Sequence, residues 1–158
     1  MIDRTPKLYI GGKQARPDSG YSITVLDAHK KVAGEVGHGN RKDIRNAVEA
    51  AHKASAWSSL NGHSRAQVLY FLAENLETRS EEFKNRISLL TGDSEEKAKR
   101  QVEASIRRIF SYAAWADKYE GRVHQPPMRG LALAIPEPFG VMGVCLLYTS
   151  DAADEWLR

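Results

Sequence analysis

The side chains of this chain that could act as a nucleophile or as metal ligands are one cysteine and five histidines. Cys145 ends the apolar stretch FGVMGVC with no base nearby in the sequence, so we expect a buried, inert thiol rather than a nucleophile. The histidines lack the short, regular spacing of a metal site, which predicts surface or helix-capping positions. They are His29, His38, His52, His63 and His124. The sequence therefore predicts no catalytic, cofactor-binding or metal-binding residue.

Two glycine-containing stretches resemble nucleotide-binding loops only in part. The stretch GGK (residues 11–13) lacks the spacing and the hydroxyl residue of a phosphate loop, and it predicts a hairpin turn. In GHGN (residues 37–40) the third glycine of the dinucleotide fingerprint is missing, because Lys42 occupies its position. Neither stretch predicts a phosphate site.

Composition limits the class of protein. A chain of 158 residues with 42% hydrophobic and 27% charged residues is typical of one folded domain. The 23 basic and 20 acidic residues are dispersed, which argues against a nucleic-acid partner. A single cysteine excludes an internal disulfide, and we find no signal peptide and no stretch long enough to span a membrane. These features predict a soluble, cytoplasmic protein without a membrane partner.

The secondary structure expected from the sequence changes along the chain, from short strands at the N-terminus to helices. Short β-runs at 7–12, 21–26 and 31–37 predict an N-terminal hairpin or meander. Asn40 can cap a following helix with Asp43 in its first turn, and this helix should end near Trp57. Its apolar stripe is expected to consist of Ile44, Ala47, Val48, Ala51 and Ala54.

Further helices are predicted between residues 64 and 121. Ser64 with Gln67 suggests a capping box, Ser80 can cap a second piece of this helix, and Gly92 ends it. Another helix begins in GDSEEKAK and is closed by Gly121. The expected buried faces are Leu69, Leu72, Ala73, Leu76, Phe83, Ile87 and Leu90, then Val102, Ile106, Ile109, Ala113 and Ala116.

The last part of the chain is predicted to be extended. Residues 122–138 are here called the arm. The alternation in GLALAIP (residues 130–136) suits a strand, but Pro136 and Pro138 exclude its far end from a central position in a sheet. An edge hairpin or an arm that reaches another subunit is expected. The stretch at 139–145 is apolar throughout and typical of a buried strand in a parallel α/β sheet.

Five segments in order resemble the N-terminal part of the aldehyde dehydrogenase superfamily over residues 7–144. They are LYIGGK, DIRNAVEAAHKASAW, SRAQVLYFLAENLETRSEEFKNRISLLTG, AAWADKYEGRV and EPFGVMGV. Within the superfamily, GNRKDIRNAVEAAHKASAW and AQVLYFLAENL look closest to the sixteenth-family type, whose members can carry two modules in tandem. On that basis, Met1 would be an internal start at a second module.

This resemblance implies an α/β fold that is incomplete. Residues 1–144 would be part of a Rossmann-type cofactor-binding domain, with a β-hairpin, three to four helices, the arm for oligomerisation and a first core strand at 141–144. The parent enzyme would be a homo-oligomer that oxidises an aldehyde to an acid with NAD or NADP. Its cysteine nucleophile, glutamate base and oxyanion-binding asparagine lie beyond the matched part, and Cys145 corresponds to a strand position. No site residue carries over.

The C-terminal residues have a different origin in our interpretation. The stretch CLLYTSDAADE, residues 145–155, matches one translated frame of a transposon-end adapter used for sequencing libraries. We therefore expect residues 145–158 to be an artefactual tail, with a genuine divergent C-terminus as the alternative. Two functions remain open: a truncated, inactive aldehyde dehydrogenase, or a stand-alone helical module that binds another protein.

Overall fold

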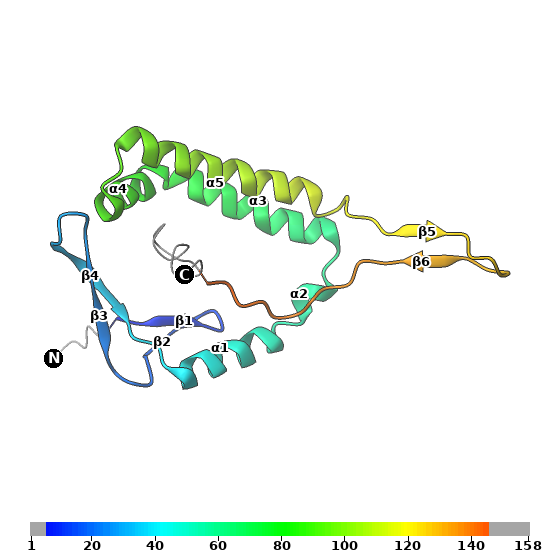
Figure 1. Ribbon diagram of the computed structural model, residues 1–158, viewed down its shortest axis with the longest axis horizontal. Helices are drawn as coiled ribbons and strands as arrows, with labels where there is room; N and C mark the ends of the chain where they lie inside the picture. The colour runs from blue at the N-terminus through cyan, green and yellow to red at the C-terminus, as the bar shows by residue number, and fades with distance from the viewer. Residues whose placement is uncertain (1–5, 146–158) are drawn as a thin grey trace, which may run out of the picture.

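The computed structural model describes residues 6–145. Within this part, two β-hairpins and helix α1 form one layer, and helices α3, α4 and α5 form a second layer (Figure 1). A third hairpin projects from the end of the helical layer, and the chain then returns past helix α2. No helix among the described residues is long and apolar enough to cross a membrane.

The first hairpin pairs β1 (Leu8–Ile10) with β2 (Lys13–Ala15) in antiparallel register. Gly11 and Gly12 form its two-residue turn with φ of 61° and 76°, a conformation that favours glycine at both positions. The predicted hairpin turn at GGK is therefore confirmed. The return strand β2 escaped prediction because it is short and carries two polar residues.

The second hairpin pairs β3 (Ser22–Leu26) with β4 (Val32–Gly37), close to the predicted bounds. The side chain of Asp27 organises its turn: Oδ1 accepts the backbone N–H groups of His29 and Lys31, both at 2.8 Å. Lys30 adopts a φ of 61°, the left-handed region that an L-residue rarely occupies.

Helix α1 (Arg41–Lys53) begins as predicted, with Asn40 as its N-cap, and the short helix α2 (Ala56–Ser59) follows it. The predicted apolar stripe is present on α1 but uncovered, since Ile44 is 66% and Val48 41% exposed. The stripe is thus a surface without a partner among residues 6–145.

Three helices form the second layer: α3 (Gly62–Thr78), α4 (Ser80–Thr91) and α5 (Glu95–Trp115). Two predicted caps are wrong. Asn61 caps α3 by accepting the N–H of Ser64 at 2.8 Å, and α4 starts at Ser80 itself without a side-chain cap. With Asn61 as the cap, α3 begins at Gly62, so Ser64 lies within the first turn of the helix and not before it.

Of the predicted helix ends, one is correct and one is wrong. Gly92 ends α4 in the left-handed conformation with φ of 74°, as predicted. Ser94 caps α5. The predicted end of α5 at Gly121 is wrong, because the helix stops at Trp115 with Ala116 as its C-cap.

The core lies between α3 and α5. Small side chains let the two helices approach closely, and the rings of Tyr70 and Phe110 meet at 6.0 Å between centroids. The buried apolar residues are Ala66, Ala73, Ala98, Val102, Ile106 and Ala113, four of which were predicted. Leu72 was also expected there, but it points elsewhere and is 51% exposed.

The arm forms the third hairpin, in which β5 (Arg122–His124) pairs with β6 (Ala132–Ala134). It extends away from both layers (Figure 1). Gly121 sits at its root, where a side-chain Cβ would overlap the carbonyl oxygen of Ala134. A hairpin is therefore formed, as one of the two predicted alternatives, but it is not at the edge of a larger sheet among the described residues.

The predicted core strand at 141–144 is not formed. Residues 139–145 have no strand hydrogen bonds, and Val144 is 78% exposed. A strand needs a neighbouring strand, and residues 6–145 contain only three separate antiparallel pairs. For the same reason Cys145 is exposed, not buried as expected. The rest of the adapter-like stretch lies outside the described residues.

The packing leaves much apolar surface open to solvent. The accessible surface of the chain is 13760 Å², whereas a compact monomer of its 17.6 kDa mass exposes about 7,900 Å². No large side chain among the described residues is fully buried. The chain therefore packs only a fraction of the apolar surface that its sequence provides.

Candidate functional site

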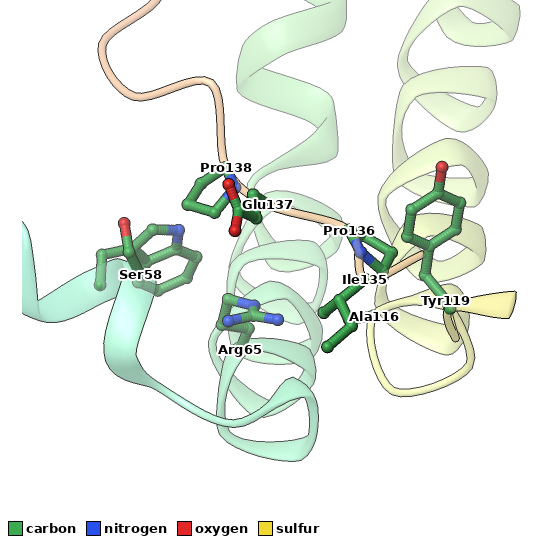
Figure 2. A pocket seen from close by; sticks show the side chains of 10 residues that line it. Ser58, Arg65, Ala116, Tyr119, Ile135, Pro136, Glu137 and Pro138 are labelled. Atoms are coloured by element: carbon green, nitrogen blue, oxygen red, sulfur yellow. The ribbon is translucent and has the colours of Figure 1, made fainter. Parts of the chain in front are cut away.

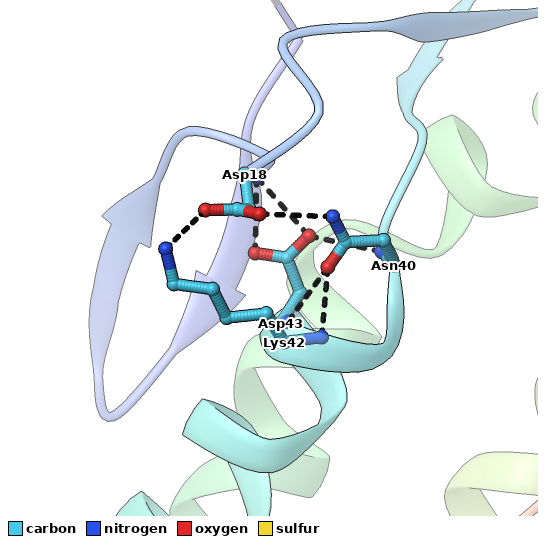
Figure 3. A network of polar contacts seen from close by, with 4 residues as sticks. All are labelled: Asp18, Asn40, Lys42 and Asp43. Carbon is cyan, nitrogen blue, oxygen red and sulfur yellow. Dashed lines mark hydrogen bonds and ion pairs between the residues drawn. The ribbon is translucent and has the colours of Figure 1, made fainter.

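A polar cluster joins the loop before β3 to the start of α1 (Figure 3). Asp43, only 5% exposed, accepts the N–H of Asp18 with both carboxylate oxygens at 3.1 Å and the N–H of Asn40 at 3.0 Å. The Asp18 carboxylate in turn accepts from Asn40 Nδ2 at 3.0 Å and pairs with Lys42 Nζ at 2.5 Å. The carboxylates of Asp18 and Asp43 thus form their hydrogen bonds and ion pair with other residues of the cluster.

The charges of this cluster balance one another. The hydrogen bond from Lys42, followed by that from Asn40, lowers the pKa of Asp18 below its usual 3.8. The same bond to Asp18 raises the pKa of Lys42 above 10.5. Both groups stay charged near neutral pH, so the cluster holds a loop in place rather than exchanging protons.

The cluster also decides whether the GHGN stretch can bind a phosphate. A free helix N-terminus attracts anions through its unpaired N–H groups. At α1 these groups bond to Asn40, whose side chain accepts from Lys42 N and Asp43 N, and two carboxylates lie beside them. A nucleotide pyrophosphate would meet negative charge there. The described residues therefore do not fit a nicotinamide cofactor at this helix.

A hollow of about 480 Å³ lies at the root of the arm, where residues 135–138 cross the ends of α3 and α5. Figure 2 shows the side chains of Arg65 and Glu137 pointing toward the same space, with Pro136 and Pro138 beside them. Arg65 Nη1 donates to the carbonyl of Leu60 at 2.5 Å. Trp57 and Tyr119 add aromatic surface to the lining. The lining therefore combines charged side chains with apolar and aromatic surface, which suits a group that has both a polar and an apolar part.

A second hollow, of about 380 Å³, also borders α2. It is lined by the end of α1, by α2 and by residues 140–142, and Trp57 borders both hollows. Neither hollow is lined by a cysteine, and the one histidine is His52. Within residues 6–145 the two hollows therefore lack the paired nucleophile and base of a covalent mechanism.

The structure does not bring the five histidines and Cys145 together in one site among the described residues. All five histidines are exposed, as the sequence predicted. No group of three or more potential metal ligands occurs among the described residues. Cys145 forms no hydrogen bond with another described residue. Arg65 and Glu137 were missed, because 72 residues separate them and no spacing pattern relates them. Asp18 was missed for the same reason.

Comparison with known proteins identifies the family. A sequence model of the aldehyde dehydrogenase family matches residues 16–147. The D-glyceraldehyde dehydrogenase (NADP(+)) of Thermoplasma acidophilum is 33% identical over 122 residues, which are 74% of this chain and 24% of that protein. An aldehyde dehydrogenase of Agaricus bisporus is 33% identical over 141 residues, 86% of this chain and 28% of its own length.

A solved structure agrees with the sequence matches. The NAD-dependent benzaldehyde dehydrogenase of Corynebacterium glutamicum superposes with a TM-score of 0.73 at 27% identity, over 82% of this chain and 28% of that one. The chain thus spans about a quarter of the length of these relatives. The matched region includes the second hairpin, all five helices and the arm, and it begins just after the first hairpin. The chain belongs to the aldehyde dehydrogenase family.

Proposed function

We propose that residues 1–144 are the N-terminal part of the cofactor-binding domain of an enzyme that oxidises an aldehyde to a carboxylic acid with NAD or NADP. The observation that carries this proposal is the family match over residues 16–147, combined with a coverage of only about a quarter of the relatives. Two of these relatives are named for different cofactors, NADP in one and NAD in the other. The choice of cofactor therefore stays open in the proposal, as does the aldehyde.

We propose further that the 158-residue chain alone neither binds the cofactor nor oxidises an aldehyde. The family's chemistry needs a thiolate that attacks the carbonyl, a base for the deacylating water and an oxyanion site. Cys145 is exposed and has no partner among the described residues. The N-terminus of α1, which follows the GHGN stretch, is occupied by the carboxylates of Asp18 and Asp43. In an open α/β sheet the ligand binds beyond the carboxyl ends of neighbouring strands, and residues 6–145 contain no such pair.

The uncovered helix faces support the same proposal. On α3, Val68, Phe71 and Leu72 are 49%, 68% and 51% exposed, and they lie opposite the face that packs against α5. A helix that is apolar on two faces is usually buried between two layers. A sheet that continues from residues 139–145 would supply the missing layer for α3 and for the stripe of α1.

Cofactor titration tests this function. We expect no binding of NAD or NADP to the 158-residue chain at millimolar concentrations by calorimetry. A chimera that replaces residues 145–158 with the corresponding remainder of the Thermoplasma acidophilum relative should bind the cofactor. Aldehyde oxidation should return only when that remainder keeps its cysteine and glutamate. Millimolar or tighter binding by the unmodified chain would contradict the proposal.

A stand-alone helical interaction module is the second candidate. One observation favours it: α3 and α5 share a core of their own, which includes Val102 and Ile106. The two candidates predict different behaviour in solution. An incomplete domain should bind hydrophobic dyes strongly and unfold without a sharp transition, whereas a module should be a monodisperse monomer with a cooperative melt.

The finer assignments are proposals with tests of their own. The two helical segments at 39–57 and 66–76 support a sixteenth-family parent, and the lone cysteine supports a cytoplasmic location. We also propose that residues 145–155 are translated adapter. Determining the nucleotides of the gene tests this directly, because an adapter must match base for base over those codons, and several synonymous differences would exclude it.

A further inference from the structure

Residues 139–145, here called the unpaired segment, follow the arm and pass α2 (Figure 1). No backbone N–H or C=O group of this segment forms a hydrogen bond with another described residue. Phe139 is 97%, Met142 72% and Val144 78% exposed, while Val141 is 38% exposed beside α1 and α2. An apolar stretch whose backbone is open at both edges can accept a strand on either side.

The composition of the unpaired segment is that of a strand that stacks on identical copies. No charged residue and no proline occurs from Phe139 to Ser150. In a parallel, in-register stack each side chain meets itself, so a charged residue would face the same charge, and a proline would remove a backbone donor. Gly140, at a φ of 94°, must become extended, a change that glycine tolerates. Identical copies of the segment can therefore stack without charge repulsion.

Two other uncharged stretches outside the helices have one edge already paired. Residues 19–26 include β3, which is bonded to β4, and residues 130–135 include β6, which is bonded to β5. A strand within a stack needs a partner on each side, and a strand of a hairpin can bind only one more. Among these three stretches of the described chain, only the unpaired segment can bind a strand at both edges.

We propose that residues 139–145 of separate molecules pair with one another as parallel, in-register strands, and that the chain assembles through this segment. The partner is a second copy of the same segment, because self-pairing requires a stretch that is uncharged throughout and open at both edges. The helices keep their positions during assembly, since the core between α3 and α5 does not include residues 139–145. This inference goes beyond the proposed enzymatic origin of the chain.

Lysine substitutions can show which surface drives assembly. Val144→Lys puts a charge into the unpaired segment, and Val123→Lys makes the same exchange on the arm, where Val123 is 68% exposed. Ile44→Lys tests the exposed stripe of α1. All three variants have the same net charge, so repulsion between whole molecules is equal. Under reducing conditions, which keep Cys145 as a thiol, we expect assembly measured by light scattering to slow severalfold for Val144→Lys alone.

Strand pairing is measured in the assembled material of the unmodified chain. Amide hydrogen exchange within residues 139–145 should be slow after assembly and fast in dilute solution, and fibre diffraction should show the spacing of about 4.7–4.8 Å between strands. A synthetic peptide of residues 139–145 with Cys145→Ser should join the assembly. Its D-enantiomer has the same hydrophobicity but the opposite strand twist, and it should not join.

Each other outcome overturns the proposal. Equal slowing by all three lysine variants would show non-specific association of apolar surface, and slowing by Val123→Lys alone would assign assembly to the arm. Slow exchange within 139–145 in dilute solution would show that the chain pairs its own segment. A chain that stays monomeric at every concentration, or equal uptake of both peptide enantiomers, would exclude strand pairing. The cofactor titration is read independently, because these experiments contain neither NAD nor NADP.

Discussion

Asp43 holds the backbone of Asp18 across 25 residues of sequence, with both carboxylate oxygens 3.1 Å from one N–H group. The same side chain completes the capping box of α1 by accepting from Asn40. A single buried carboxylate therefore fixes the start of a helix and the loop that precedes the second hairpin. The contact thus positions two parts of the same layer, α1 and the loop before β3.

Replacing Asp43 by alanine should loosen both elements. Two backbone N–H groups would lose their acceptor in a nearly buried site, which costs about 1–3 kcal/mol. The measurement is hydrogen exchange at Asp18, Asn40 and the first turn of α1, where exchange should accelerate. Glu49→Ala on the exposed side of α1 is the control and should leave these rates unchanged. Unchanged exchange in the Asp43 variant would contradict the assigned role.

The Asp18 carboxyl should titrate below its usual pKa of 3.8, because Lys42 and Asn40 donate hydrogen bonds to its charged form. A lowered pKa in the folded state means that the contact stabilises at pH values above the usual pKa and is lost as pH falls through the lowered one. NMR titration of the carboxyl carbon measures the midpoint. Lys42→Ala should move it back toward the usual value, and high salt should do so in part. A midpoint at or above 3.8 in the unmodified chain would refute this prediction.

Gly62→Ala should separate the beginning of α3 from the end of α5. The added Cβ would lie 2.5 Å from the carbonyl oxygen of Ala116 and 2.8 Å from the Cα of Asp117, both backbone atoms that cannot rotate away. We expect a loss of about 1–3 kcal/mol, the usual cost of overpacking, seen as faster hydrogen exchange in the first turn of α3. Gly34→Ala is the matched control, since nothing lies within 4 Å of its Cβ position. Equal effects of both substitutions would show that the close approach is unimportant.

Lys30→Gly should stabilise the second hairpin by about 0.5–1 kcal/mol. A left-handed φ costs an L-residue about 1–2 kcal/mol, and the greater freedom of glycine in the unfolded chain offsets part of the gain. Hydrogen exchange of the β3 and β4 amides measures the change. Lys31→Gly, at a neighbouring residue with ordinary φ, should weaken the hairpin instead. If the two variants shift exchange in the same direction, the strain at Lys30 is not the cause.

Helix starts and ends that depend on residues close in the sequence could be predicted from the sequence. Asn40 and Gly92 act through hydrogen bonds and backbone angles within one helical turn, so their roles were visible in the sequence. Ser64 is not the cap because Asn61, only three residues earlier, already caps the helix, which places Ser64 in its first turn. Both residue types are good caps, and the sequence alone did not rank them correctly.

Contacts between distant residues could not be predicted in the same way. Leu72 was expected in the core because its spacing fits a buried face, yet α5 covers the side of α3 that carries Ala66 and Ala73. The apolar pattern at 139–145 predicted a strand, which forms only beside another strand. The contact of Asp18 with Asp43 follows from the path of the chain, and so does the placement of Arg65 and Glu137 around one hollow. No spacing pattern in the sequence indicates either arrangement.

The packing of α3 against α5 has a consequence for the order of events during synthesis. These helices are joined by α4 alone, so their contacts need only a short loop closure, and such contacts form early in folding. Both helices that make the Tyr70 and Phe110 contact are outside the ribosome once synthesis has passed Trp115 by the length of chain that fills the exit tunnel. The nascent chain can therefore bury this seam while Val68 and Phe71 still face water, and we expect chaperones to engage it at that stage.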